Sequence, residues 1–255
     1  MRLKDRVAIV TGAGSGIGRA TAVRFAEAGA DVAIVYAFEP EEARKTGEMV
    51  RATGRRALVV EADVRRPAQV TQAVEEVARE WGRLDVMVSN AGLYRWTRFV
   101  DIPEAEWDDV VDTNLKGAFA CSQAAARAMI ALGRPGVILV VSSTQGSRPL
   151  VGTAHYGASK AGMLGLVKAM ALELAPHHIR VVALSPGVSE SAGNEQSLAD
   201  PARRREVEGQ IPWGRVGRPR DFAGILAFLA SDDADYITGV NLVADGGLLV
   251  AGPQV

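Results

Sequence analysis

Tyr156 and Lys160 stand four residues apart, a spacing that could support proton transfer. On a helix, residues i and i+4 lie on one face, so the lysine amine would sit near the phenol oxygen. A free tyrosine titrates near pH ~10, and a neighbouring ammonium would lower the phenol pKa toward neutral pH. The pair therefore predicts an acid/base group. By itself the spacing also occurs on ordinary surface helices, so the assignment depends on the surrounding elements.

Those elements alternate along the chain, because short apolar runs rich in Val and Ile are followed by longer segments of helical period. The expected strands are Val7–Val10, Val32–Tyr36, Ala57–Val60, Val86–Val88, Val137–Val141, Val181–Leu184 and Val240–Val243. The expected helices lie near 17–28, 40–53, 68–80, 104–132, 155–175 and 219–230. This alternation predicts an α/β fold of the doubly wound Rossmann type, a seven-stranded, mostly parallel sheet with helices on both faces. Residues 1–255 are expected to form a single domain, with a lid over about 189–214.

Composition excludes several classes of function. The chain has 255 residues, and 29 Lys and Arg balance 30 Asp and Glu, leaving a formal charge of −1. No global field recruits nucleic acid or a membrane surface, so we expect neither partner. The single Cys121 excludes an intramolecular disulfide and a multi-cysteine metal site, and no metal is expected. No apolar run reaches the ~18 residues of a membrane span. A cytoplasmic location is therefore expected.

A glycine-rich turn opens the first expected helix, directly after the first strand. Its pattern is T-G-x-x-x-G-x-G, through Gly12, Gly16 and Gly18, and it differs from G-x-G-x-x-G. Glycines let the backbone approach a pyrophosphate at the positive N-terminus of a helix. Three further loops follow the third, fourth and sixth strands and should meet at the same edge of the sheet: Asp63-Val64, Ser89–Gly92 and Pro186-Gly187. Together they predict one dinucleotide crevice.

Taken together, these motifs resemble the short-chain dehydrogenase/reductase family over essentially the whole chain. The family's ordered motif residues are matched here by Gly12, Gly16, Gly18, Asp63, Asn90-Ala91-Gly92, Asn114, Ser143, Tyr156 and Lys160. Ser143 is chosen over Ser142 because the family places its serine thirteen residues before the tyrosine. The resemblance implies an NAD(P)-dependent oxidoreductase that moves a hydride between a nicotinamide and a secondary alcohol or carbonyl.

The resemblance also implies a role for each matched residue. Tyr156 would exchange a proton with the substrate oxygen, Lys160 would lower its pKa and hold the ribose, and Ser143 would orient the substrate. Asn114 would perturb its helix and hold a water that relays protons from the lysine. The residues expected at the cofactor are Gly12, Ser15, Gly16, Ile17, Gly18, Tyr36, Asp63, Val64, Asn90, Ala91, Gly92, Tyr156, Lys160, Pro186, Gly187 and Ser189.

The preferred cofactor is NAD over NADP. Tyr36 stands where NAD-preferring relatives usually have Asp, and no Arg follows it to bind a 2′-phosphate. Ser15 occupies the place of a basic residue in the glycine loop, and Glu39 adds a repelling charge nearby. Arg44 is close enough in sequence to weaken this argument.

The sequence around the predicted active site most resembles that of glucose 1-dehydrogenase-like enzymes and other sugar or polyol dehydrogenases, which suggests the class of substrate. The alternatives are a 3-oxoacyl-acyl-carrier-protein reductase and a non-catalytic dinucleotide sensor, although a sensor usually loses the tyrosine or the lysine. The polar or aromatic candidates for the substrate pocket are Tyr94, Arg95, Trp96, Arg98, Gln145, Arg148, His155 and Trp213.

The resemblance also implies a homotetramer in which small residues of 104–132 and 155–175 form an interface. The apolar C-terminal Leu248–Val250 is expected to be buried against a neighbouring subunit.

Overall fold

The computed structural model describes residues 3–191 and 195–251, and its centre is a seven-stranded sheet. The strands are β1 (Val7–Thr11), β2 (Asp31–Tyr36), β3 (Ala57–Glu61), β4 (Val86–Ser89), β5 (Gly136–Val141), β6 (Ile179–Pro186) and β7 (Asn241–Ala244). Their order is β3-β2-β1-β4-β5-β6-β7, and every neighbouring pair is parallel. The order reverses direction between β1 and β4, the point at which such sheets bind ligands. The doubly wound prediction is confirmed.

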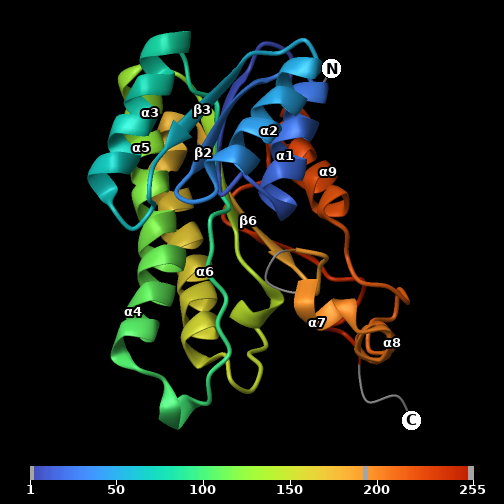
Figure 1. Cartoon of the computed structure of the whole chain (residues 1–255). Coiled ribbons are helices and arrows are strands. Elements are labelled where there is room, and N and C mark those ends of the chain that lie inside the picture. The colour runs from blue at the N-terminus through green and yellow to red at the C-terminus, as the bar shows by residue number, and fades with distance from the viewer. Residues whose placement is uncertain (1–2, 192–194, 252–255) are drawn as a thin grey trace.

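Helices cover both faces of the sheet (Figure 1). The longer ones are α1 (Gly16–Glu27), α2 (Pro40–Ala52), α3 (Pro67–Trp81), α4 (Glu104–Val111), α5 (Gly117–Ala131), α6 (Ala154–Leu174) and α9 (Pro219–Leu229). One face carries α1, α2 and α9, and the other carries α3, α5 and α6. The central strands β1, β4 and β5 are thus buried on both sides, which explains their apolar sequences, whereas the edge strands β3 and β7 are only partly buried.

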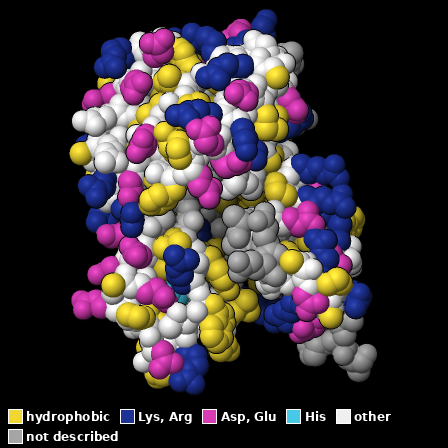
Figure 2. All heavy atoms as spheres, viewed as in Figure 1, with side chains coloured by type: hydrophobic (Ala, Val, Ile, Leu, Met, Phe, Trp, Pro, Cys, Tyr) yellow, Lys and Arg dark blue, Asp and Glu magenta, His cyan; other side chains and the backbone are white. Residues whose placement is uncertain are grey.

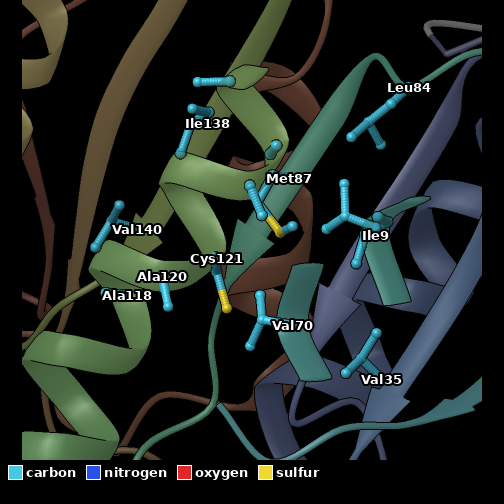
Figure 3. Packing of buried hydrophobic residues seen from close by; sticks show 14 of the residues in the cluster. Ile9, Val35, Val70, Leu84, Met87, Ala118, Ala120, Cys121, Ile138 and Val140 are labelled. Carbon is cyan, nitrogen blue, oxygen red and sulfur yellow. The ribbon is translucent and has the colours of Figure 1, made fainter. Parts of the chain in front are cut away.

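Successive side chains of β5 show how the sheet supplies two cores. Ile138 and Val140 point toward α5 and α6, while Val137, Leu139 and Val141 join the opposite cluster under α1 and α9. In the first cluster, Cys121 of α5 packs between the helix and the sheet (Figure 3). Burial raises the pKa of the Cys121 thiol to about 12, so this cysteine behaves as a small core residue.

The region expected to be one helix over 104–132 is interrupted. A π-helical turn, Asp112–Lys116, separates α4 from α5 and contains the buried Asn114. Gly117 follows it directly, where a Cβ would lie 2.8 Å from a methyl group of Val64. Some of the small residues that are expected at a subunit interface pack inside the chain instead, because Ala124, Ala125 and Ala126 of α5 belong to the core between this helix and the sheet.

Two short helices that the periodicity did not predict form the lid, α7 (Glu195–Ala199) and α8 (Pro201–Gly209). They stand beside the body of the molecule beyond the carboxyl end of the sheet (Figure 1). A small separate cluster of Leu198, Ile211 and Val216, joined by Leu248, anchors the lid. Leu248 therefore packs within its own chain, whereas Val250 is exposed. In the described part of the chain, no helix combines the length and the apolar content needed to span a membrane.

Candidate active site

A cleft of about 700 Å³ opens at the carboxyl ends of β1, β4, β5 and β6. Its walls come from the glycine loop, the loops after β4 and β5, the first turns of α6, and the lid. The space-filling view shows the surface hollowed between the lid and the body of the molecule (Figure 2). The parallel topology brings these loops together, because every strand of the sheet ends at the same edge.

The glycine loop has the backbone shape that a pyrophosphate requires. Gly12 and Gly16 adopt φ values of +63° and +51°, a region that side chains disfavour. A Cβ on Gly18 would lie 2.6 Å from Nδ2 of Asn90 and would also collide with the carbonyl oxygen of Gly12. The absence of a side chain at Gly18 therefore lets α1 begin in direct contact with the end of β1. Gly16 and Ile17, in the first turn of α1, line the cleft. These residues form a cradle that suits a dinucleotide phosphate.

Asn90 and Thr11 fix the glycine loop to the end of β4. The Asn90 Nδ2 donates to the Thr11 carbonyl at 2.9 Å, and the backbone amides of Asn90 and Ala91 donate to Thr11 Oγ1 at 3.0 and 3.1 Å. Two loops that are almost eighty residues apart in sequence are therefore held as one unit. This arrangement gives Asn90 a structural task beside its place in the cleft lining.

Tyr156 and Ser143 meet at the other end of the cleft. Ser143 follows β5 and caps a 3-10 turn, where its Oγ accepts a hydrogen bond from the Gln145 amide at 3.1 Å. Tyr94 packs edge-to-face on the Tyr156 ring with centroids 5.0 Å apart. Burial raises the pKa of Tyr156 to about 12, although the hydroxyl of Ser143 acts to lower it. The phenol is therefore protonated at neutral pH in this arrangement.

Lys160 is buried beneath the tyrosine. Its Nζ donates to the carbonyl of Val141 at 3.0 Å and lies 5.5 Å from the centre of the Tyr156 ring. Burial lowers the pKa of Lys160 to about 8. The expected lowering of the phenol pKa is wrong for the structure, because burial of the Tyr156 ring is the largest influence on that pKa and raises it. The i, i+4 spacing does place both groups on one side of α6.

Asn114 holds the loop that follows β4. Its Oδ1 accepts from the Leu93 amide at 2.7 Å, and its Nδ2 donates to the Leu93 carbonyl at 3.0 Å and to Ser159 Oγ at 3.0 Å. A Cβ on Gly92 would lie 3.3 Å from the Asn114 Oδ1 and 3.7 Å from the Lys160 Nζ. The π-helical turn thus places this amide where it orders the loop after β4 and contacts Ser159 of α6.

The structure brings most of the predicted site residues to the cleft and leaves others outside it. Among the predicted catalytic and cofactor residues, the lining contains Gly12, Ser15, Gly16, Ile17, Asn90, Ala91, Gly92, Ser143, Tyr156, Lys160, Pro186, Gly187 and Ser189. Gly18, Tyr36, Asp63, Val64 and Asn114 are not part of it. The carboxylate of Asp63 is held by Arg65, and Val64 packs into the core. The roles of all these residues stay predictions.

Of the substrate-pocket candidates, Tyr94, Gln145 and Arg148 line the cleft, whereas Arg95, Trp96, Arg98, His155 and Trp213 do not. His155 is fully buried and contacts the Glu106 carboxylate at 3.1 Å. Four lining residues belong to the lid segment that the sequence predicts, although none of them is a named candidate: Leu198, Arg203, Val207 and Gln210. The sequence reasoning missed Leu248 and Leu249, because it assigns the apolar C-terminal residues to a subunit contact.

Comparison with known proteins places this geometry in context. Residues 12–249 match the family model described as "Enoyl-(Acyl carrier protein) reductase". The chain is 38% identical to 2-dehydro-3-deoxy-D-gluconate 5-dehydrogenase of Escherichia coli, over 97% of this chain and 96% of that protein. It is 40% identical to L-rhamnose 1-dehydrogenase (NAD(P)(+)) of a Sphingomonas species, covering 97% and 98%. It is 42% identical to a 3-oxoacyl-[acyl-carrier-protein] reductase of Staphylococcus aureus, covering 94% and 97%.

Solved structures agree with these relatives. A short-chain type dehydrogenase/reductase from Mycobacterium marinum superposes with a TM-score of 0.92 at 37% identity, covering 98% of this chain and 97% of that one. A putative 2-deoxy-D-gluconate 3-dehydrogenase from Agrobacterium tumefaciens with bound NADP gives 0.90 at 35% identity, covering 98% of each chain. With identity and coverage at this level along the whole sheet and cleft, the chain belongs to the short-chain dehydrogenase/reductase family and is an NAD(P)-dependent oxidoreductase acting on CH–OH groups.

Proposed function

We propose that the enzyme oxidises a secondary hydroxyl of a sugar or polyol to the carbonyl, or runs the reverse reduction. The observation that carries this proposal is the convergence of Ser143, Tyr156 and Lys160 at one end of a cleft whose other end is the glycine cradle. Relatives named as dehydrogenases of a deoxy-keto-gluconate and of rhamnose support the substrate class. The whole chain, residues 1–255, would act as a single catalytic domain in the cytoplasm.

The nicotinamide, when bound, supplies the hydride acceptor or donor. Gly12, Gly16 and the backbone amides of the first turn of α1 would hold the pyrophosphate of the dinucleotide. Tyr156 would then exchange the substrate's hydroxyl proton, and Ser143 would hydrogen-bond the same oxygen and fix its position. Because burial raises the pKa of Tyr156 to about 12, the phenol is poised as the proton donor of the reduction. In the oxidation, the nearby Lys160 ammonium would favour the phenolate form.

Asn114 would act as a positioning residue. Its amide links the Leu93 backbone to Ser159, and Ser159 Oγ donates in turn to the Tyr156 carbonyl at 2.7 Å. A short network therefore connects the substrate-side loop to the turn of α6 that carries Tyr156. We propose that this network fixes the position of Tyr156 relative to Ser143, so that the substrate oxygen can form hydrogen bonds with both hydroxyl groups at the same time.

The test is a spectrophotometric panel. Purified enzyme would be mixed with NAD⁺ or NADP⁺ and a series of sugars, polyols and simple secondary alcohols, and cofactor reduction followed by absorbance. We expect turnover with sugars or polyols. The alternative, a 3-oxoacyl-carrier-protein reductase, would instead oxidise NADPH with 3-oxoacyl thioesters and ignore the polyols. That second pattern would contradict the proposal.

NAD is the proposed cofactor. Glu39 lines the cleft just after β2, where a 2′-phosphate would approach, and like charges repel. The nearby cations have carboxylate partners: Arg44 pairs with Glu41, and Lys45 pairs with Glu42 at 2.6 Å. We therefore expect kcat/KM to favour NAD⁺. Glu39→Gln should raise kcat/KM for NADP⁺ relative to NAD⁺ several-fold, and an enzyme that already prefers NADP⁺ would contradict this assignment.

A homotetramer is proposed as the assembled form. Several large apolar side chains are exposed on the adjoining helices α4, α5 and α6: Trp107 at 39%, Phe119 at 43%, Ile130 at 40% and Leu172 at 80%. Figure 1 shows α4 continuing the line of α5, with α6 beside them. Exposed apolar surface of this kind is typical of a subunit interface. Sedimentation of a stable monomer would contradict the proposal.

A further inference from the structure

The charged side chains of the cleft are unevenly distributed. In the described part of the chain, the lining contains Glu39, Arg148, Lys160 and Arg203. Glu39 belongs to the cofactor end, after β2, and Lys160 lies beneath Tyr156 with its Nζ on the Val141 carbonyl. The loops and the lid around the proposed substrate end therefore contribute Arg148 and Arg203. The carboxylate among the described lining residues, that of Glu39, lies at the cofactor end.

Arg148 stands five residues after Ser143, on the segment that leads from β5 into α6. Its amide donates to the Thr144 carbonyl at 2.9 Å, which fixes the backbone. The next residue, Pro149, packs against the turn that carries Tyr156, because a Cβ on Gly157 would lie 3.1 Å from Pro149 Cβ. The backbone that carries Arg148 is thus fixed beside the turn of Tyr156, and its side chain is exposed and lines the cleft.

Most hydrogen-bond donors of the Arg148 guanidinium have no described partner within the chain. Its described hydrogen bond is a long one, 3.4 Å from Nη1 to the carbonyl of Leu248. Two arginines of the lid are instead paired with carboxylates: Arg203 with Glu206 at 2.6 Å, and Arg204 with Glu190. No described carboxylate lies within ion-pair distance of Arg148. Arginine has five N–H donors and stays charged at any physiological pH, so this site can still bind an anion.

Building on the proposed function, we propose that the substrate carries a carboxylate, which Arg148 binds while Tyr156 and Ser143 hold the reacting hydroxyl. The natural substrate class is then a polyhydroxy acid, such as an aldonic or deoxy-keto acid, and an uncharged polyol would be a poorer substrate. Because Glu206 pairs with Arg203 at 2.6 Å, Arg148 is the arginine of the described lining that has no carboxylate partner among the described residues. A carboxylate can also accept two parallel hydrogen bonds from one guanidinium.

The test compares substrates that share a carbon skeleton and differ in charge, namely a series of aldonic acids and the corresponding alditols. A charge-assisted bidentate contact should give the preferred acid a kcat/KM about 10-fold or more above its alditol. Arg148→Gln should bring this ratio close to one, and raised salt should reduce it in the wild type. Arg98→Gln is the matched control, since Arg98 is exposed, pairs with Asp101 at 2.7 Å and is not part of the lining. Its ratio should equal that of the wild type.

Thermal protection by the same acids, measured in the presence of NAD⁺, provides a readout that does not depend on turnover. Protection that is lost in Arg148→Gln supports the inference, even if no hydride is transferred and the proposed function fails. Conversely, oxidation of alditols with neither binding nor turnover of acids overturns the inference and leaves the proposed function standing. An acid-to-alditol ratio unchanged by Arg148→Gln, or absence of any acid binding, also overturns the inference.

Discussion

Replacing the buried Lys160 should raise the free energy of unfolding, although it removes a residue of the proposed active site. The pKa of Lys160 falls from its usual 10.5 to about 8 because the side chain is buried with 3% of its surface exposed. A difference of about 2.5 pKa units corresponds to about 3 kcal/mol, at roughly 1.4 kcal/mol per unit. Lys160→Met removes this penalty but loses the hydrogen bond to Val141, which is worth about 1 kcal/mol. We expect a net gain of about 2 kcal/mol at pH 7.

The pH dependence makes this prediction specific. The native state binds the lysine proton more weakly than the unfolded chain does, so the penalty is fully present below about pH 8. It disappears as the pH rises toward 10.5 and the unfolded chain also loses the proton. Urea unfolding at fixed protein concentration should therefore show a gain at pH 7 that is gone by about pH 10. Lys168→Met, at an exposed position of the same helix, should change stability by less than about 0.5 kcal/mol. A less stable Lys160→Met, or an equal gain at both pH values, would refute the reasoning.

Two further substitutions test the frame of the site. Gly18→Ala should cost about 1–3 kcal/mol and weaken NAD⁺ binding, because the new methyl group collides with the Gly12 carbonyl. Gly224→Ala in α9, with no atom within 4 Å of the new Cβ, should be neutral or slightly stabilising in the same urea and binding titrations. Asn114→Ala should lose about 2–4 kcal/mol and lower kcat, because it orphans the amide and carbonyl of Leu93. Wild-type urea unfolding and kinetics in Asn114→Ala would show that this network is dispensable.

Much of the fold could be predicted because local chemistry and global topology agree. Buried parallel strands have uninterrupted Val and Ile runs, so β1 through β7 were located to within a few residues. The spacing of Gly12, Gly16 and Gly18 predicts a tight turn. In the structure Gly12 and Gly16 have positive φ, and Gly18 lies in close contact with the Gly12 backbone. These features depend on nearest neighbours in the sequence, which is why they can be read from it.

Other features depend on long-range packing. The π-helical turn around Asn114 forms where an amide satisfies the Leu93 backbone, a contact that helical periodicity cannot reveal. The pKa of Tyr156 was expected to fall because charge was considered without desolvation, whereas burial raises it. Leu248 contributes to the cleft because the chain after β7 folds back under the lid, and an apolar terminus alone could not distinguish this from a subunit contact.

The central claim is that Tyr156 is the group that exchanges the proton with the substrate oxygen. Tyr156→Phe removes the hydroxyl while retaining the ring, so the edge-to-face contact with Tyr94 and the cofactor cradle should persist. The most direct measurement determines the NAD⁺ dissociation constant and the turnover number of this variant side by side. We predict a dissociation constant within about threefold of wild type and a kcat reduced by about 100-fold or more. A variant that binds NAD⁺ and turns over at a near wild-type rate would contradict the account.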